Sequence, residues 1–111
     1  MEFLSRKENG GTVVALVGRL DAVTTPEYER RVQELLAGDE TRLVLDLERL
    51  DYISSAGLRG LLLTAKLLKA RDGQVRFANV TGNVRSVFDM SGFANMFPIE
   101  ESVAAALSAL G

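Results

Sequence analysis

The chain has 111 residues, of which 47% are hydrophobic and 25% are charged. This length and apolar content predict one folded domain and argue against disorder, since disordered chains are poor in apolar residues. The formal net charge is −2, from 13 basic and 15 acidic residues. No basic cluster is found along the chain, so binding to nucleic acid is not expected.

Cysteine and histidine are both absent from the sequence. Disulfides and metal sites built from thiolate or imidazole ligands are therefore excluded, and we expect no metal or other cofactor. Residues 1–10 lack the apolar core of a signal peptide, and the apolar stretch at 58–68 is broken by Arg59 and Lys66. Such a stretch is too interrupted to cross a bilayer. The sequence therefore predicts a cytoplasmic protein without membrane insertion.

The first expected elements are a short strand, a turn and a longer strand. Residues 3–7 are expected to form an edge strand, and Asn9-Gly10 supplies the positive φ angles that a hairpin turn needs. Residues 12–18 (TVVALVG) are apolar at consecutive positions. That pattern is typical of a strand covered on both faces, as in a largely parallel sheet.

A helix is expected to follow, from residues 24–27 to about Ala37. Two frames for its start stay open: Thr24 and Glu27 form a capping box, or Thr25 caps the helix and Pro26 is its first residue.

The rest of the chain continues to alternate between strands and helices. The pattern predicts strands at 42–47, 74–80 and 97–99, a loop at 48–54, and helices at 55–70, 81–90 and 101–110. This order implies right-handed crossovers between parallel strands. We therefore predict a single α/β domain over residues 1–111. It has a mainly parallel sheet of four to five strands, an N-terminal hairpin strand and about four helices.

Motifs of common enzyme classes are missing from the sequence. It contains no GxGxxG, no P-loop and no GxSxG elbow. Without histidine, a catalytic serine would need a lysine or a carboxylate as its base, and neither Asp51 nor Lys66 has a diagnostic spacing from Ser55. We therefore predict a protein that is not an enzyme and has no catalytic residues.

The segment at residues 46–62 carries the most information, because a strand and a short loop lead into a helix that begins near Ser54-Ser55-Ala56-Gly57. Function collects at the carboxyl ends of parallel strands, and a helix N-terminus there favours a negative group. Ser55 has two interpretations. It is either a structural N-cap or an exposed serine whose phosphorylation would add about −1.5 to −2 charges and change binding more than folding.

Other residues also allow two interpretations. Asp21 lies in the loop after the second strand, where it either contacts a partner, helps to hold the Ser55 loop, or bonds to its own backbone in a turn. Thr24 is a cap or a contact. Met90 and Phe93, at the end of the third helix, are either partner contacts or a hydrophobic clasp over the helix end.

Three blocks of the sequence together resemble the STAS family of anti-sigma factor antagonists. Residues 54–58 (SSAGL) are similar to the family's Asp-Ser-Ser/Thr-Gly-Leu segment, which opens a helix. Residues 18–21 (GRLD), followed by Thr24, resemble the loop after the second strand. Residues 87–93 (VFDMSGF) resemble the third helix and its turn. The resemblance covers essentially the whole chain, in order and with similar spacing.

The resemblance implies a phosphorylation-gated protein-binding switch. The unphosphorylated antagonist binds an anti-sigma factor serine kinase and frees the sigma factor, phosphorylation releases the kinase, and a phosphatase resets the protein. The phosphorylated position matches Ser55, with Ser54 as the second choice. The expected partner-binding residues are Asp21, Thr24, Ser54, Ser55, Ala56, Gly57 and Leu58.

Two residues depart from the family pattern. Ser54 stands where Asp is usual, which affects what a kinase would recognise, and Ala56 stands where Ser or Thr is usual, which removes a competing phosphate acceptor. Some STAS domains are not phosphorylated and act as scaffolds or transporter-associated modules. A constitutive assembly module of that kind is the alternative function.

Overall fold

A hairpin opens the chain, as the turn signal predicts. In the computed structural model, which describes residues 1–110, β1 (Glu2–Glu8) pairs antiparallel with β2 (Gly11–Leu20). Gly10, in the turn, has a φ of 105°, a conformation open to glycine but strained for other residues. β2 extends beyond the predicted strand at both ends, and Val13, Val14 and Leu16 are fully buried. Burial of both alternating faces confirms that the strand is covered on both sides.

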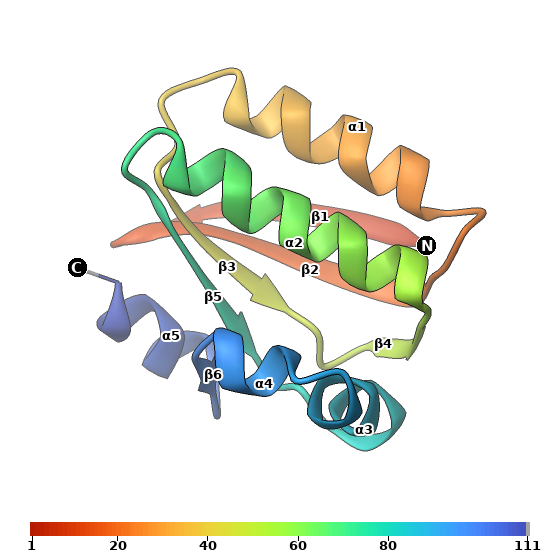
Figure 1. Cartoon of the computed structure of the whole chain (residues 1–111). Helices are drawn as coiled ribbons and strands as arrows, with labels where there is room; N and C mark the ends of the chain where they lie inside the picture. Colours follow the sequence, from red (N-terminus) through yellow and green to blue (C-terminus); the bar gives the residue numbers. More distant parts are fainter. Residues whose placement is uncertain (111) are drawn as a thin grey trace.

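The rest of the sheet is parallel. Its order is β1-β2-β3-β5-β6, and β4 pairs with β2 beyond the end of β3, as Figure 1 shows. The parallel strands are β3 (Arg42–Asp46), β4 (Leu50–Ile53), β5 (Gln74–Ala78) and β6 (Ile99–Glu100).

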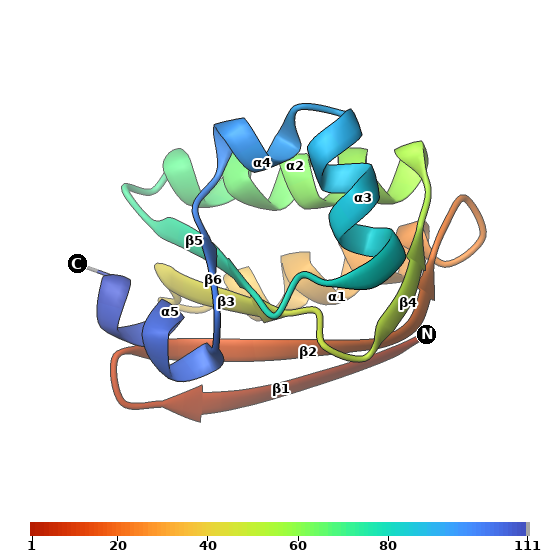
Figure 2. The same ribbon diagram turned by 90° about the horizontal axis from the view of Figure 1, so that it is seen from below.

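Helices cover the two faces of this sheet unequally. In Figure 1, α1 and α2 run side by side across one face, and α3 and α4 pack at one edge of the same core. α5 packs on the opposite face of the sheet, over Val13, Val44 and Ala78 (Figure 2). The helices are α1 (Thr25–Leu36), α2 (Ser55–Lys69), α3 (Gly82–Met90), α4 (Phe93–Met96) and α5 (Val103–Ala109).

The α/β class, the mainly parallel sheet and the hairpin strand are confirmed, and two short elements are added. Within residues 1–110 the sheet has six strands and the chain has five helices. The segment predicted as a loop at 48–54 contains β4. This strand pairs with the end of β2, across a register shift at Gly18 and Arg19. α4 is a single turn between α3 and β6.

The end of α3 resolves one open question. Phe93 is buried and packs against Phe77 and Phe88, with ring centres 5.6 and 4.8 Å apart. It therefore belongs to an aromatic cluster under the helix end, as the clasp interpretation requires. Met90, by contrast, is 86% exposed.

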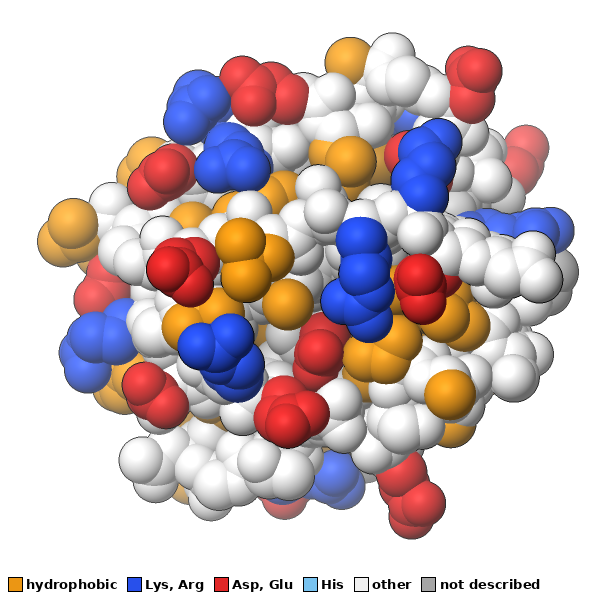
Figure 3. Space-filling view, turned by 180° about the vertical axis from the view of Figure 1, so that it is seen from behind, with side chains coloured by type: hydrophobic (Ala, Val, Ile, Leu, Met, Phe, Trp, Pro, Cys, Tyr) orange, Lys and Arg blue, Asp and Glu red, His pale blue; other side chains and the backbone are white. Residues whose placement is uncertain are grey.

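The side of the molecule opposite α1 and α2 carries both positive and negative charges. Figure 3 shows acidic and basic side chains interspersed with apolar ones over this side of the molecule. Within residues 1–110, no helix has both the length and the apolar character that a membrane span requires.

Candidate functional site

The start of α2 is anchored to the ends of two strands. β4 pairs in parallel with the last residues of β2, so that Ile53 lies beside Leu20. The backbone N–H of Ser54 then donates a hydrogen bond to the carbonyl oxygen of Leu20, over 3.0 Å. The first turn of α2 is therefore held at the carboxyl edge of the sheet, the edge where parallel α/β folds place their functional sites.

Ser54, not Ser55, caps the helix. Its backbone is extended, with φ −98° and ψ 175°, and its hydroxyl accepts a hydrogen bond from the N–H of Gly57 at 3.3 Å. The structural-cap interpretation of Ser55 is therefore wrong, because the neighbouring serine fills that role. Ser55 is the first helical residue, its side chain is exposed, and its hydroxyl has no hydrogen-bond partner within residues 1–110.

The three residues after Ser55 are all less exposed than Ser55 itself. Gly57 is buried, and a β-carbon built on it would lie 2.5 Å from the carbonyl oxygen of Leu20. Leu58 is half-buried and packs against the main core, and Ala56 is also half-buried. Gly57 thus lets the helix approach β2 closely, and that approach leaves Ser55 as the exposed residue of the segment.

The loop from β2 to α1 is closed by its own polar side chains. The Asp21 carboxylate accepts hydrogen bonds from the N–H groups of Val23 and Thr24, at 3.0 and 3.1 Å. The Thr24 hydroxyl donates to the carbonyl oxygen of Arg19 at 2.9 Å and accepts from the N–H of Asp21 at 3.0 Å. The turn interpretation of Asp21 is confirmed.

The structure confirms Thr24 as the cap position of α1, but not the capping box or the alternative frame. Thr24 is the N-cap residue, but its hydroxyl makes no capping bond because it is already engaged within the loop. The helix begins at Thr25, so that Pro26 is its second residue and not its first. The hydroxyl of a threonine in a tight turn can bond to nearby backbone groups instead of capping a helix. Here the Thr24 hydroxyl bonds to the backbone of Arg19 and Asp21.

Hydrogen bonds from the loop lower the pKa of the Asp21 carboxyl below its usual range. The N–H of Thr24 contributes most, and Arg19 adds a smaller effect through an ion pair at 3.5 Å. The negative charge of Asp21 therefore forms part of the loop's own hydrogen bonding.

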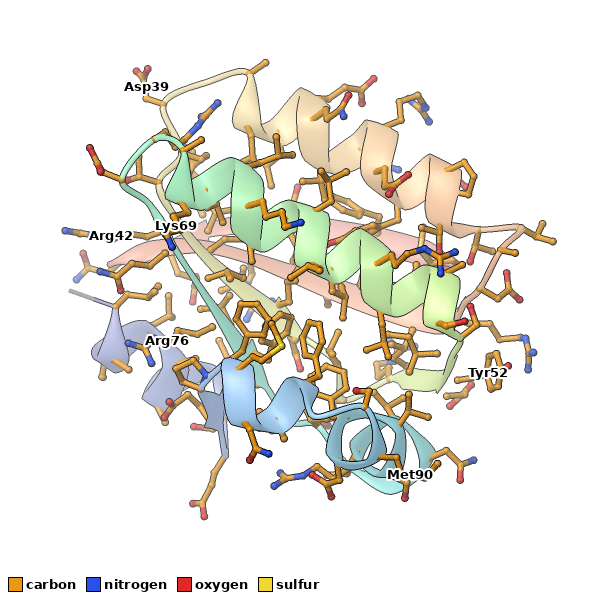
Figure 4. The ribbon with its side chains drawn as sticks, viewed as in Figure 1. Asp39, Arg42, Tyr52, Lys69, Arg76 and Met90 are labelled. Carbon is orange, nitrogen blue, oxygen red and sulfur yellow. The ribbon has the colours of Figure 1, made fainter. Side chains whose placement is uncertain are left out.

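Arg19 and Tyr52 form a contact beside this loop that sequence reasoning missed. The Arg19 guanidinium lies 4.2 Å from the centre of the Tyr52 ring. Figure 4 shows Tyr52 projecting from β4 at the end of the molecule where α2 begins. Tyr52 is 38% exposed and Val23, in the loop, is 86% exposed. The four-residue β4 has no alternation of buried and exposed positions, so the sequence offered no signal for Tyr52.

The family model for the STAS domain matches residues 3–106. The chain belongs to the STAS domain family. Two curated relatives match nearly its full length. BtrV of Bordetella bronchiseptica, provisionally named an anti-sigma factor antagonist, is 38% identical over 98% of this chain and 94% of its own. The anti-sigma F factor antagonist of Paenibacillus polymyxa is 29% identical over 91% of this chain and 87% of its own.

Solved structures share the fold of this STAS domain. The crystal structure of an anti-sigma factor antagonist from Mycobacterium paratuberculosis superposes with a TM-score of 0.89. It covers 98% of this chain and 92% of the other, at 26% identity.

Proposed function

We propose that this STAS domain is an anti-sigma factor antagonist, a regulatory binding protein and not an enzyme. In its unphosphorylated form it binds an anti-sigma factor serine kinase in the cytoplasm and so frees a sigma factor. The names of the relatives support the antagonist function. The observation that carries the proposed switch is the exposed hydroxyl of Ser55 at the first position of α2, which has no hydrogen-bond partner among the described residues 1–110.

Phosphorylation of Ser55 needs only an accessible hydroxyl and a kinase that holds ATP. The Ser55 oxygen attacks the γ-phosphorus of ATP and forms a new P–O bond. The bond from that phosphorus to the bridging oxygen breaks, ADP leaves, and the hydroxyl proton passes to a base on the kinase. Hydrolysis of the phosphoserine by a separate phosphatase returns the hydroxyl and releases inorganic phosphate.

The location of Ser55 separates the effect on binding from the effect on folding. A phosphate there carries about −1.5 to −2 charges at neutral pH. The helix tolerates that charge because the free N–H groups of its first turn and its dipole both favour an anion. A partner packed over the same surface would have to desolvate the charge, which is costly unless the charge is paired. The phosphorylated form is therefore expected to release its kinase while staying folded.

The proposed docking surface combines the start of α2 with the β2–α1 loop. Ser54, Ser55 and Ala56 present the helix end, while Gly57 and Leu58 support it through packing. Asp21 and Thr24 hold the loop. Exposed Val23 and Tyr52 add the apolar area that the partner would cover.

Mass spectrometry tests the switch at its chemical step. The intact protein is incubated with the cognate anti-sigma factor kinase and ATP, and the added mass is measured for wild type, Ser55→Ala and Ser54→Ala. We expect one added phosphate on wild type and on Ser54→Ala, and none on Ser55→Ala. No added phosphate on wild type would contradict the proposal and favour constitutive assembly. Phosphate retained on Ser55→Ala would move the site to another residue.

A further inference from the structure

A shallow groove separates the starts of α1 and α2, and Ala56, the residue after Ser55, is one of its lining residues. Its volume is about 310 Å³, and it is lined by Ala22, Thr25, Pro26, Glu29, Ala56 and Arg59. Thr25 lines the groove, and its hydroxyl oxygen is buried and has no hydrogen-bond partner within residues 1–110. Arg59 is exposed and forms no hydrogen bond or ion pair with any residue in that range. Arg59 is therefore a lining residue of the groove whose charge has no partner within residues 1–110.

The spacing places Arg59 where a phosphate on Ser55 would find it. Both residues lie in α2, four positions apart. Side chains at that spacing occupy the same helix face, with β-carbons about 5–6 Å apart. The order is also the favourable one, because an acidic group stabilises a helix best when it precedes its basic partner. A guanidinium can donate two parallel hydrogen bonds to phosphate oxygens.

The charges around this pair leave Arg59 available. The N-cap residue Ser54 is neutral, so no carboxylate at the cap opposes the phosphate. Asp21 is engaged by its own loop and by Arg19. Glu29 is the acidic residue that lines the groove, and it forms no ion pair with Arg59.

We propose that Arg59 holds the phosphate of phosphorylated Ser55 within the same chain. This pairing rests on the proposed function, because it requires that Ser55 carries a phosphate. Phosphorylation then changes the docking surface twice: it adds a dianion at the helix start, and it occupies the guanidinium that the unmodified surface presents to a partner.

The test uses the full chain with phosphoserine incorporated at position 55 during synthesis, so that no kinase is needed. The second ionisation of the phosphate is followed by ³¹P NMR as a function of pH. A cation in contact with the phosphate favours the dianion. We therefore expect the phosphate pKa in the Arg59 protein to lie below that in Arg59→Gln by about 0.2–0.4. The phosphate pKa in Arg59→Lys should lie between those two values.

Lys66→Gln is the matched control, since it removes one positive charge from the same helix. Lys66 lies eleven residues after Ser55, about 16 Å along the helix axis, which exceeds the Debye length of about 10 Å at 0.1 M salt. Lys66→Gln should therefore leave the phosphate pKa unchanged. Equal pKa values in wild type and Arg59→Gln, or equal shifts in Arg59→Gln and Lys66→Gln, would overturn the pairing.

The two proposals fail in different ways. If the kinase phosphorylates Ser55 but Arg59→Gln leaves the phosphate pKa unchanged, the pairing is wrong and the switch stands. If the synthetic phosphoserine shows the difference but the kinase adds no phosphate, the switch is wrong and the pairing is a property of the helix alone.

Discussion

Gly57 and Leu20 meet where no β-carbon fits: an added methyl group on Gly57 would lie 2.5 Å from the Leu20 carbonyl oxygen. The same carbonyl accepts the N–H of Ser54, so the contact sets the position of the whole first turn of α2. Close packing at this point therefore decides how Ser55 is presented. The requirement for glycine is spatial, since Gly57 is absent from the positions with positive φ.

Gly57→Ala should destabilise the domain by about 1–3 kcal/mol, because overpacking against backbone atoms cannot relax as a side chain would. Urea unfolding measures the loss. Gly38→Ala is the control, since a β-carbon there would meet its nearest neighbour, the Leu35 carbonyl oxygen, at an ordinary 3.9 Å. We expect that variant to change the free energy of unfolding by less than about 1 kcal/mol. Equal stability of both variants would show that the first turn of α2 can shift.

The buried hydroxyls of Tyr28 and Thr64 join α1 to α2, with their oxygens 2.6 Å apart. Thr64 donates to the carbonyl oxygen of Gly60 at 3.1 Å, so Tyr28 is the donor between the two hydroxyls. Burial raises the pKa of Tyr28, which keeps it protonated. The two hydroxyls therefore have unequal roles. Without the Tyr28 hydroxyl, Thr64 still donates to the Gly60 carbonyl oxygen, whereas without the Thr64 hydroxyl, the Tyr28 hydroxyl has no acceptor within residues 1–110.

Thr64→Val should therefore cost more stability than Tyr28→Phe. Tyr28→Phe should lose about 1 kcal/mol, whereas Thr64→Val strands a buried hydroxyl and should lose about 1–3 kcal/mol. The double variant should lose less than the sum of the two, because the stranded group is then gone. Thermal or urea unfolding of the three proteins checks the order, and a reversed order would contradict the assigned donor.

Glu40 links the hairpin to the loop before β3. Its carboxylate lies 2.8 Å from the Lys7 amine and accepts the Thr12 hydroxyl at 2.5 Å, and its side chain is only 14% exposed. The hydrogen bond from Lys7 is the main cause that lowers the Glu40 pKa, followed by that from Thr12. A carboxylate with a lowered pKa stabilises the folded state above its unfolded pKa of about 4.3, and that contribution is lost as the pH falls through the folded value.

Glu40→Gln should therefore destabilise the protein at pH 7 and much less at pH 3. Urea unfolding at the two pH values measures both differences. Glu34→Gln, which alters an exposed ion pair with Arg30, should change stability little at either pH. A penalty for Glu40→Gln that is the same at both pH values would mean that the carboxylate charge does not stabilise this junction.

Tyr52 offers a test of the docking surface that leaves Ser55 untouched. Tyr52→Ala should weaken binding of the kinase about tenfold, or about 1.4 kcal/mol, because an exposed aromatic side chain of the proposed docking surface is lost. The fold should lose about 1 kcal/mol or less, the scale of an exposed contact with Arg19. Leu4→Ala removes another exposed apolar side chain, from the edge strand β1, and should bind normally. Equal binding by both variants would place the interface elsewhere.

Long apolar patterns predicted most of this fold, but the two short elements β4 and α4 were not predicted. The consecutive apolar residues at 12–18 indicated a strand buried on both faces, and the structure confirms it. β4 could not be predicted, because its two middle residues are both exposed and it exists through pairing with β2 across a register shift. Tertiary pairing of this kind leaves no periodic signal in the chain.

At the candidate site, the sequence predicted that a helix begins near residues 54–57, but not which of the two serines caps it. The order Ser54-Ser55 predicted a helix start, yet which serine caps depends on the hydrogen bond between Ser54 and Leu20. Thr24 and Glu27 matched a capping box, but the Thr24 hydroxyl donates its hydrogen bond to the backbone carbonyl oxygen of Arg19. In both cases a backbone hydrogen bond between segments or within a loop, which the sequence does not reveal, accompanies the observed cap.

The affinity of the cognate kinase for unmodified and phosphorylated protein tests the central claim most directly. Isothermal titration calorimetry should show a dissociation constant at least tenfold larger for the form with phosphoserine at position 55 than for the unmodified protein. Ser55→Glu should show the same increase. Thermal unfolding of both should show that they remain folded. Ser55→Ala should bind like wild type. Equal affinity of the phosphorylated and unmodified forms would contradict the switch and leave a domain whose binding ignores this serine.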